Sequence, residues 1–191
     1  MNRAVDALVA GAGLVLASPI LGLAALASKL EGQGPVFYRQ TRVGKDGEDF
    51  DVLKLRSMVV GAESLGAGYA VDEGDARITR VGRILRRASI DELPQLWNVL
   101  RGDMSIIGPR PTLRYQVEQY DDHQCRRLDV RPGLTGWAQV HGRASLPWAE
   151  RIELDVWYVD HRSPRVDLAI LLRTPLALFR GTYRGASGGW R

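Results

Sequence analysis

The segment ALVAGAGLVLASPILGLAALA, residues 7–27, decides the fold class of this chain, because only Ser18 and Pro19 interrupt its apolar side chains over 21 residues. A continuous helix of that length would be about 30 Å long, which is enough to cross the hydrocarbon core of a bilayer. Three interpretations follow: a helix that spans the membrane, a re-entrant helix that enters and returns, or a cleaved signal peptide.

The signal peptide is supported by Arg3, ahead of the apolar run, and by the small-residue sequence ALA at residues 25–27. Against it, the run is long for a signal peptide, and Asp6 lies where signal peptides carry positive charge. Cleavage would also release a secreted protein whose single cysteine, Cys125, cannot form an internal disulfide. We therefore favour membrane insertion and a reducing, cytoplasmic setting for the rest of the chain.

Pro19 favours the re-entrant helix over the spanning one. Proline lacks an N–H and its ring crowds the carbonyl one turn earlier, so we expect a break or kink here, with the Ser18 hydroxyl bonding the freed carbonyl. Each half is then too short to span the bilayer. Basic residues flank both ends of the segment: Arg3, Lys29, Arg39 and Arg42. A helix hairpin keeps both ends on the cytoplasmic side that basic residues prefer, so we expect residues 1–31 to form a re-entrant membrane helix and residues 32–191 a domain at the cytoplasmic face.

The composition is ordinary for a globular protein, with 45% hydrophobic and 25% charged residues, so wholesale disorder is excluded. Its bases are mostly arginine, since only Lys29, Lys45 and Lys54 are lysines. The planar fork of arginine suits phosphate or an anionic lipid surface. Codon bias in a GC-rich genome explains the same excess equally well, so only arginines that lie in motifs support an argument.

Short helices and strands are predicted after the apolar segment. The sequence GKDG at residues 44–47 has turn chemistry between β-type runs at residues 36–38 and 50–55, which predicts a β-hairpin. Residues 78–88 place apolar side chains at helical spacing among arginines, which indicates a short basic amphipathic helix, either solvated or lying on anionic headgroups. Residues 166–179 predict a second interfacial helix, kinked at Pro175. The expected fold is α+β and mostly helical, with the re-entrant helix-hairpin, the β-hairpin and interfacial amphipathic helices around a small domain.

Asp91 and Glu92 are adjacent acids in the segment RRASIDELPQLWNVL, residues 86–100. Ser89 and Glu92 have the spacing of a capping box, and two acids suit the first turn of a helix, so the spacing alone favours an ordinary capped helix. With Ser89 as the cap, Pro94 would fall where its N–H is needed; with Asp91 as the cap, nothing is lost.

Two stretches rich in glycine and proline follow. In RGDMSIIGPRP, residues 101–111, a short apolar strand precedes a loop that holds Arg110 between two prolines. Restricting the backbone on both sides lowers the entropy cost of fixing a guanidinium, which phosphate recognition rewards. The stretch VRPGLTGWAQVHGR, residues 130–143, combines an aromatic ring, an amide and arginines that suit the binding of a nucleotide.

Together these segments resemble the bacterial sugar transferase family, the monotopic phosphoglycosyl transferases, in its minimal catalytic-domain form. The resemblance covers nearly the whole chain, including Ser18-Pro19 and residues 50–58, 89–100, 102–111, 130–143 and 153–159. Two positions depart from the family pattern. Asn2 stands where the family usually has the lysine of Lys-Arg-x-x-Asp, which bears on one headgroup contact and not on the chemistry, and His141 stands where relatives often carry asparagine.

The resemblance implies a phosphoglycosyl transferase that moves a sugar 1-phosphate from a UDP-sugar to polyprenyl (undecaprenyl) phosphate and releases UMP. This would be the first membrane step of glycoconjugate biosynthesis (polysaccharide, O-antigen or glycoprotein), at the cytoplasmic face of the bacterial inner membrane. Asp91 would be the nucleophile of a covalent phosphosugar intermediate. Mg²⁺ would neutralise the diphosphate, with Glu92 and Asp91 as metal ligands, or with Glu92 as a positioning group. The implied phosphate- and substrate-binding residues are Lys54, Arg56, Arg86, Arg110, Trp137, Gln139 and Arg143. The last three, and Asp155, are equally open to a structural role.

Two other classes of protein stay open. One is a secreted basic protein cleaved after Ala27, and the other is a non-catalytic adaptor that binds anionic membrane lipids through its arginine-rich helix. Nucleic acid is not an expected partner, because no aromatic side chains interleave those arginines. The identity of the sugar, the glycan pathway, the lipid length and the oligomeric state do not follow from the sequence.

Overall fold

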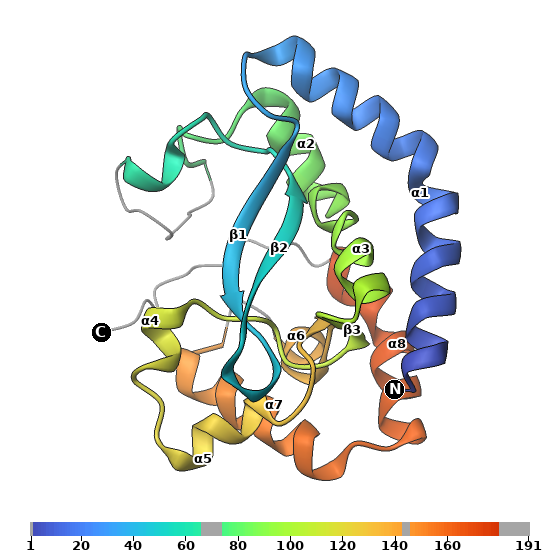
Figure 1. The fold of residues 1–191 in the computed structure, drawn as a ribbon, viewed down its shortest axis with the longest axis vertical. Helices are drawn as coiled ribbons and strands as arrows, with labels where there is room; N and C mark the ends of the chain where they lie inside the picture. The colour runs from blue at the N-terminus through green and yellow to red at the C-terminus, as the bar shows by residue number, and fades with distance from the viewer. Residues whose placement is uncertain (1, 66–73, 143–145, 180–191) are drawn as a thin grey trace.

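The computed structural model describes residues 2–65, 74–142 and 146–179, and within them the chain is mostly helical, with two small sheets (Figure 1). The helices are α1 (Arg3–Glu31), α2 (Arg80–Arg87), α3 (Gln95–Arg101), α4 (Arg114–Val117), α5 (Asp122–Cys125), α6 (Trp137–His141), α7 (Trp148–His161) and α8 (Pro164–Phe179). The strands are β1 (Phe37–Val43), β2 (Asp49–Leu55), β3 (Ser105–Ile107) and β4 (Gly133–Thr135). Short 3-10 turns are η1 (Lys45–Gly47), η2 (Ala62–Ser64), η3 (Ile90–Glu92) and η4 (Arg126–Leu128).

Helix α1 runs without interruption through Pro19, but it changes direction partway along its length (Figure 1). Pro19 cannot donate to the carbonyl of Val15, four residues earlier, and the Ser18 hydroxyl donates to that carbonyl instead, at 2.8 Å. The predicted kink and its hydroxyl partner are therefore confirmed. Among the described residues, α1 alone combines the length and the mean hydropathy, 2.1, needed to cross a membrane.

The first turns of α1 are tied to the rest of the molecule by two charged side chains. The guanidinium of Arg3 donates to the carbonyls of Val99 and Leu100 in the last turn of α3, where backbone carbonyls lack the full set of partners within the helix. The buried Asp6 carboxylate accepts hydrogen bonds from the Ser105 hydroxyl and from the Ile106 N–H of β3, each at about 3 Å. Asp6, which counted against a signal peptide, is thus part of the interior.

Both halves of α1 have a packed inner face and an exposed apolar outer face. On the inner face, Ala10 is fully buried, and a Cβ on Gly13 would lie 3.2 Å from Leu96, so small residues let α1 approach α3 closely. On the outer face, Leu16 in the first half and Leu30 in the second are each 79% exposed. A soluble helix has no reason to present large apolar side chains on its outside, so this face is suited to contact with lipid.

Strands β1 and β2 form the predicted antiparallel hairpin, longer than the sequence indicated and closed by η1. Asn98 on α3 fixes β2 against that helix: its Oδ1 accepts from the Leu53 N–H at 3.0 Å and its Nδ2 donates to the Asp51 carbonyl at 2.7 Å. The buried amide thereby substitutes for a neighbouring strand and holds Lys54, the next residue of β2, beside the start of α3.

Strands β3 and β4 form a parallel pair that the sequence did not predict. Backbone lies directly on backbone here, because a Cβ on Gly133 would lie 2.0 Å from the Gly108 nitrogen and one on Gly136 would lie 2.2 Å from the Gly108 carbonyl oxygen. Only glycine permits this approach. It anchors the start of the loop that carries Arg110.

The two amphipathic helices are present. The Thr79 hydroxyl caps α2 by accepting from the Gly82 N–H at 2.9 Å. Leu85 of α2 is buried, whereas Ile84 is 68% exposed among exposed arginines. Helix α8 contains Pro175 and buries Ile170 in the same core cluster as Ala10 of α1; its exposed apolar residues are Leu168, Leu171, Leu172 and Leu176. In Figure 1, α3 and α8 lie beside the first half of α1.

Candidate active site

Asp91 and Glu92 lie in η3, the single 3-10 turn between α2 and α3. Ser89 enters this turn in the left-handed region, with φ of 54°, and its side chain makes no capping hydrogen bond. Asp91 does not cap α3 either, because the residue at the N-cap is Pro94. Both capped-helix interpretations are therefore wrong, and the two carboxylates are not used to end a helix.

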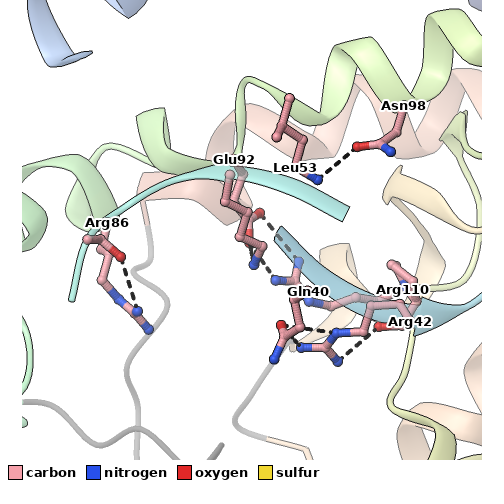
Figure 2. Close-up of polar contacts among 10 residues, drawn as sticks. Gln40, Arg42, Leu53, Arg86, Glu92, Asn98 and Arg110 are labelled. Atoms are coloured by element: carbon pink, nitrogen blue, oxygen red, sulfur yellow. Dashed lines mark hydrogen bonds and ion pairs between the residues drawn. The ribbon is translucent and has the colours of Figure 1, made fainter. Parts of the chain in front are cut away.

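Glu92 is held by two cations from different parts of the chain (Figure 2). One carboxylate oxygen accepts from Lys54 Nζ at 3.3 Å and from Arg110 Nη2 at 2.5 Å, and the other lies 3.4 Å from Arg110 Nη1. Burial alone would raise the pKa of Glu92, but the charges of Arg110 and Lys54 outweigh it and hold the pKa well below its usual range. Glu92 is therefore ionised at neutral pH.

Asp91 differs from its neighbour. In the described part of the chain no hydrogen bond or ion pair engages its carboxylate, although the residue is only 7% exposed. Burial, and next the charge of Glu92, raise its pKa, and the cations Lys54, Arg86 and Arg110 oppose this rise. An uncommitted carboxylate among cations, with a raised pKa, has the properties of a nucleophile for an electrophile that carries negative charge.

Lys54 completes this group from β2. Burial lowers its pKa, and the charge of Glu92 opposes the change. Lys54 lies among the two carboxylates and the guanidinium groups of Arg110 and Arg42, an arrangement that can receive additional negative charge, such as that of a phosphate. The structure therefore brings Asp91, Glu92, Lys54 and Arg110 together, as the sequence predicted.

Arg42, held by Gln40, extends the cationic group along β1. The sequence analysis assigned neither residue to the site. Arg42 donates to Gln40 Oε1 from Nη2 at 2.6 Å and from Nε at 3.1 Å, and its Nη1 lies 3.4 Å from the Pro111 carbonyl (Figure 2). Tyr38 is paired with Lys54, so alternate residues of β1 lie on the same face as that lysine. Had the full length of β1 been recognised, the alternation of side chains along the strand would have placed Gln40 and Arg42 on the face of Lys54.

Comparison with known proteins identifies the family of the chain. The profile of the bacterial sugar transferase family matches residues 1–181, which is almost the entire chain. The chain belongs to the bacterial sugar transferase family. The resemblance inferred from the sequence motifs is confirmed.

Several relatives in the bacterial sugar transferase family are curated. A UDP-glucose:undecaprenyl-phosphate glucose-1-phosphate transferase of Caulobacter vibrioides is 48% identical over 181 residues, which cover 91% of this chain and 67% of the relative. The exopolysaccharide production protein ExoY of Rhizobium meliloti is 38% identical, with 95% of this chain and 88% of the relative covered. A UDP-N-acetylgalactosamine-undecaprenyl-phosphate N-acetylgalactosaminephosphotransferase of Aeromonas hydrophila is 44% identical over 95% of this chain. This chain spans only 44% of the length of the Aeromonas protein.

The remaining basic residues expected in a sugar transferase site lie at its edge or away from it. The Arg86 guanidinium lies 3.5 Å from the Ser57 hydroxyl, and its charge acts on Asp91. Arg56 instead donates to the carbonyls of Ser28, Gly32 and Gln33, where α1 ends. The structure therefore uses Arg56 to hold the end of α1, and its predicted phosphate contact has no support in this arrangement. Arg143 lies outside the described residues.

Trp137 and Gln139 lie on α6, packed against α7 and α8. Trp137 stacks on Trp157 with 4.6 Å between ring centroids, and Arg173 lies 5.6 Å from its ring. Gln139 is buried on the same short helix. Within the described ranges neither residue contacts the acidic pair, so their predicted role in nucleotide binding stays a prediction.

The same acidic pair is suited to binding a divalent metal only when oxygen atoms of a substrate complete the coordination. No cluster of three or more histidine, cysteine, aspartate or glutamate side chains that could hold a metal occurs in the described residues. Mg²⁺ is often bound by one or two carboxylates, with phosphate oxygens and water filling the octahedron. Asp91 and Glu92 meet this requirement when a diphosphate supplies the other oxygens.

Proposed function

We propose that this chain transfers a sugar 1-phosphate from a UDP-sugar to polyprenyl phosphate, through a covalent intermediate on Asp91. The observation that supports this most directly is the contrast within the acidic pair: Glu92 is engaged by Lys54 and Arg110, whereas the Asp91 carboxylate is uncommitted. The names of the Caulobacter and Aeromonas relatives describe transfer of this kind to undecaprenyl phosphate.

In the first half-reaction, an Asp91 oxygen attacks the β-phosphorus of the UDP-sugar. A P–O bond to the enzyme forms, the bond between the β-phosphorus and the bridging oxygen breaks, and UMP leaves with the bridging oxygen and the electron pair. In the second half-reaction, a phosphate oxygen of the polyprenyl phosphate attacks the same phosphorus. The acyl phosphate bond then breaks, which restores the Asp91 carboxylate and releases polyprenyl diphosphate sugar.

The surrounding residues supply charge and position. Lys54 and Arg110 would stabilise the charge that develops on the phosphoryl oxygens, and Arg86 would extend this field at the edge of the site. Mg²⁺, held by Glu92 and Asp91 with substrate oxygens, would supply neutralisation of the diphosphate and of the leaving UMP. Separating the reaction into two steps lets one site receive a soluble donor and a lipid acceptor in turn.

The membrane arrangement fits this chemistry, because the phosphate of a polyprenyl phosphate lies at headgroup height. We infer that α1 is a re-entrant helix and that the exposed faces of α2 and α8 lie on anionic lipid at the cytoplasmic face of the inner membrane. The exposed arginines of α2 (Arg80, Arg83 and Arg87) flank the outward Ile84 as expected for such a helix. Cleavage after Ala27 would remove Asp6 and Ala10 from the interior, which argues against the signal peptide; a purified protein that began at Ser28 would overturn the proposal.

The deciding test of the proposed function is capture of the phosphosugar. The full chain in detergent or nanodiscs is incubated with UDP-sugars labelled with ³²P at the β-phosphate, without the lipid acceptor. Label should appear on the protein while unlabelled UMP is released in equal amount, and addition of polyprenyl phosphate should move the label to lipid. A panel of UDP-sugars in this assay identifies the donor. A chain that releases no UMP with any of them would exclude the transferase and leave the membrane-surface adaptor.

Replacing Arg86 with glutamine is expected to move the acidic limb of the pH profile of kcat/KM for UMP release to higher pH. The Arg86 charge lowers the pKa of Asp91, so its removal lets that pKa rise further, and the nucleophile is then protonated at a higher pH. Arg83→Gln, on the exposed face of the same helix, is the matched control and should leave the limb in place. If the acidic limb of Arg86→Gln had its midpoint at the same pH as that of the unaltered chain, Asp91 would not be the group that titrates in this limb.

Replacing Pro19 with leucine is expected to straighten α1 and to lower activity by at least about a hundredfold, because a spanning helix would carry Asn2 across the bilayer and break the contacts of Arg3 with α3 and of Asp6 with β3. Leucine restores an N–H that can donate to the Val15 carbonyl, which the Ser18 hydroxyl now occupies. The topology is checked with a cysteine placed at Asn2 in a Cys125→Ser background, labelled from each side of the membrane. In the Pro19→Leu variant this cysteine should become accessible from the periplasm; labelling confined to the cytoplasmic side would refute the role of the kink.

A further inference from the structure

Arg127 is an interior arginine that the proposed mechanism does not use. It lies in η4, and only 4% of its surface is exposed. Its guanidinium donates to the Tyr120 hydroxyl and to the Asp155 carboxylate, and it lies between the rings of Tyr120 and Trp148, at 5.6 and 5.8 Å from their centroids. Burying an arginine is costly unless its donors are used, and because Nε makes no hydrogen bond within the described residues, the third contact of the terminal nitrogens is informative.

That third contact is with the active-site loop. Arg127 Nη2 donates to the main-chain carbonyl of Arg110 at 3.0 Å. The side chain of the same Arg110 binds Glu92. The buried pair Arg127–Asp155 therefore connects α7 to the backbone of a residue whose guanidinium faces the acidic pair.

The carbonyls on either side of Arg110 are also held. The Pro109 carbonyl accepts from the Gly133 N–H at 2.8 Å, and the Thr112 carbonyl accepts from the Val43 N–H at 2.9 Å. The Pro111 carbonyl lies 3.4 Å from Arg42 Nη1. Four consecutive carbonyls thus have donors from three separate segments, β1, η4 and β4, and Arg127 of η4 supplies the donor at Arg110 itself. A prolyl ring on each side further restricts this backbone.

We propose that Arg127, oriented by Asp155 and Tyr120, is a positioning residue that fixes Arg110 for recognition of the donor diphosphate. This inference rests on the proposed function and assigns Asp155 to the support of Arg127 and not to the nucleotide. Lysine cannot reproduce the role, because a single ammonium cannot reach the Arg110 carbonyl, the Tyr120 hydroxyl and the Asp155 carboxylate with the geometry of a planar fork.

The test is a double-mutant cycle that joins Arg127→Lys to Arg110→Ala, with kcat/KM for UMP release as the readout. Alone, Arg127→Lys should lower kcat/KM by about tenfold or more, within the range that follows from misplacing a recognition group. In the Arg110→Ala background it should cause no further loss beyond twofold, because it acts only through the guanidinium that is already absent. Arg126→Lys is the matched control: this neighbouring arginine is exposed, pairs with Asp160, and should retain full activity.

Losses that multiply in the two backgrounds, or full activity in Arg127→Lys, would overturn the proposal. The thermal midpoint of each variant is measured in the same detergent, and if Arg127→Lys does not fold, Tyr120→Phe takes its place in the cycle. That change removes the hydroxyl that accepts from Arg127 and that also donates to the Thr112 hydroxyl at 3.3 Å on the same loop, so a smaller loss is expected, and it too should vanish in the Arg110→Ala background. An unaltered chain that releases no UMP would instead refute the proposed function, which separates the two failures.

Discussion

Replacement of Asp91 with asparagine should abolish capture of the ³²P-labelled phosphosugar and lower UMP release by at least about 10³-fold, as expected when a covalent nucleophile is removed. Asparagine preserves the shape of the side chain, and the Asp91 carboxylate makes no hydrogen bond within the described residues that the change would disrupt. The thermal midpoint should therefore fall little or rise, because the change also removes a charge that burial penalises. The measurement is the amount of label retained on the protein per mole of chain.

Asp49→Asn provides the control, since this exposed aspartate at the start of β2 pairs with Arg114 and lies outside the site. It should retain both label and turnover. If label persisted on Asp91→Asn and was lost no faster than from the unaltered chain, another residue would be the nucleophile. Treatment with hydroxylamine, which cleaves acyl phosphates, should remove the label from the unaltered protein.

Replacement of Glu92 with glutamine should lower kcat by on the order of 10²-fold and move both limbs of the pH profile to lower pH. The charge of Glu92 raises the pKa of Asp91, so without it the nucleophile ionises at a lower pH. The same charge holds up the pKa of Lys54 against the effect of burial, so without it Lys54 loses its proton at a lower pH as the solution is made alkaline. The acidic limb of Glu92→Gln should therefore move in the direction opposite to that of the acidic limb of Arg86→Gln.

The same variant separates two roles of Glu92. If Glu92 is a metal ligand, its replacement should raise the Mg²⁺ concentration needed for half-maximal activity. If Glu92 only positions Lys54 and Arg110, its replacement should leave that concentration unchanged. Gln95→Glu is unsuitable as a control because it buries a new charge, so Glu153→Gln on the exposed face of α7 is used. A pH profile of Glu92→Gln with unmoved limbs would contradict the electrostatic account of the pair.

Local sequence patterns predicted the parts of the fold that depend on local chemistry. The Gly44–Gly47 turn specified the hairpin, and the Ser18-Pro19 pair specified both the kink of α1 and the hydroxyl that compensates for it. In the site, the acidic pair and the loop between two prolines were recognised because each is a compact motif whose chemistry lies within a few residues. The structure brings their members together.

What the sequence did not predict depends on contacts between distant segments. The short apolar strand before the Arg110 loop was predicted and is β3, but its parallel pairing with β4 was not, because that association rests on Gly108, Gly133 and Gly136 from two distant segments. Arg56 was assigned to phosphate because the resemblance to the sugar transferase family implied a basic contact there. Its donors are used instead by the carbonyls where α1 ends, which become visible only once that helix is placed beside β2. The capping box failed for a related reason, since Ser89 adopts a left-handed backbone that the spacing cannot show.

The attachment of Arg3 and Asp6 to α3 and β3 has a practical consequence for anyone who wishes to work with this protein in water. Deleting residues 1–31 would leave the Leu100 carbonyl without its Arg3 donor and the buried Ile106 N–H without its Asp6 acceptor. A truncated version should therefore misfold, however polar the remainder. A water-soluble variant is better sought by redesigning the outward leucines of the second half of the helix while its first two turns are kept.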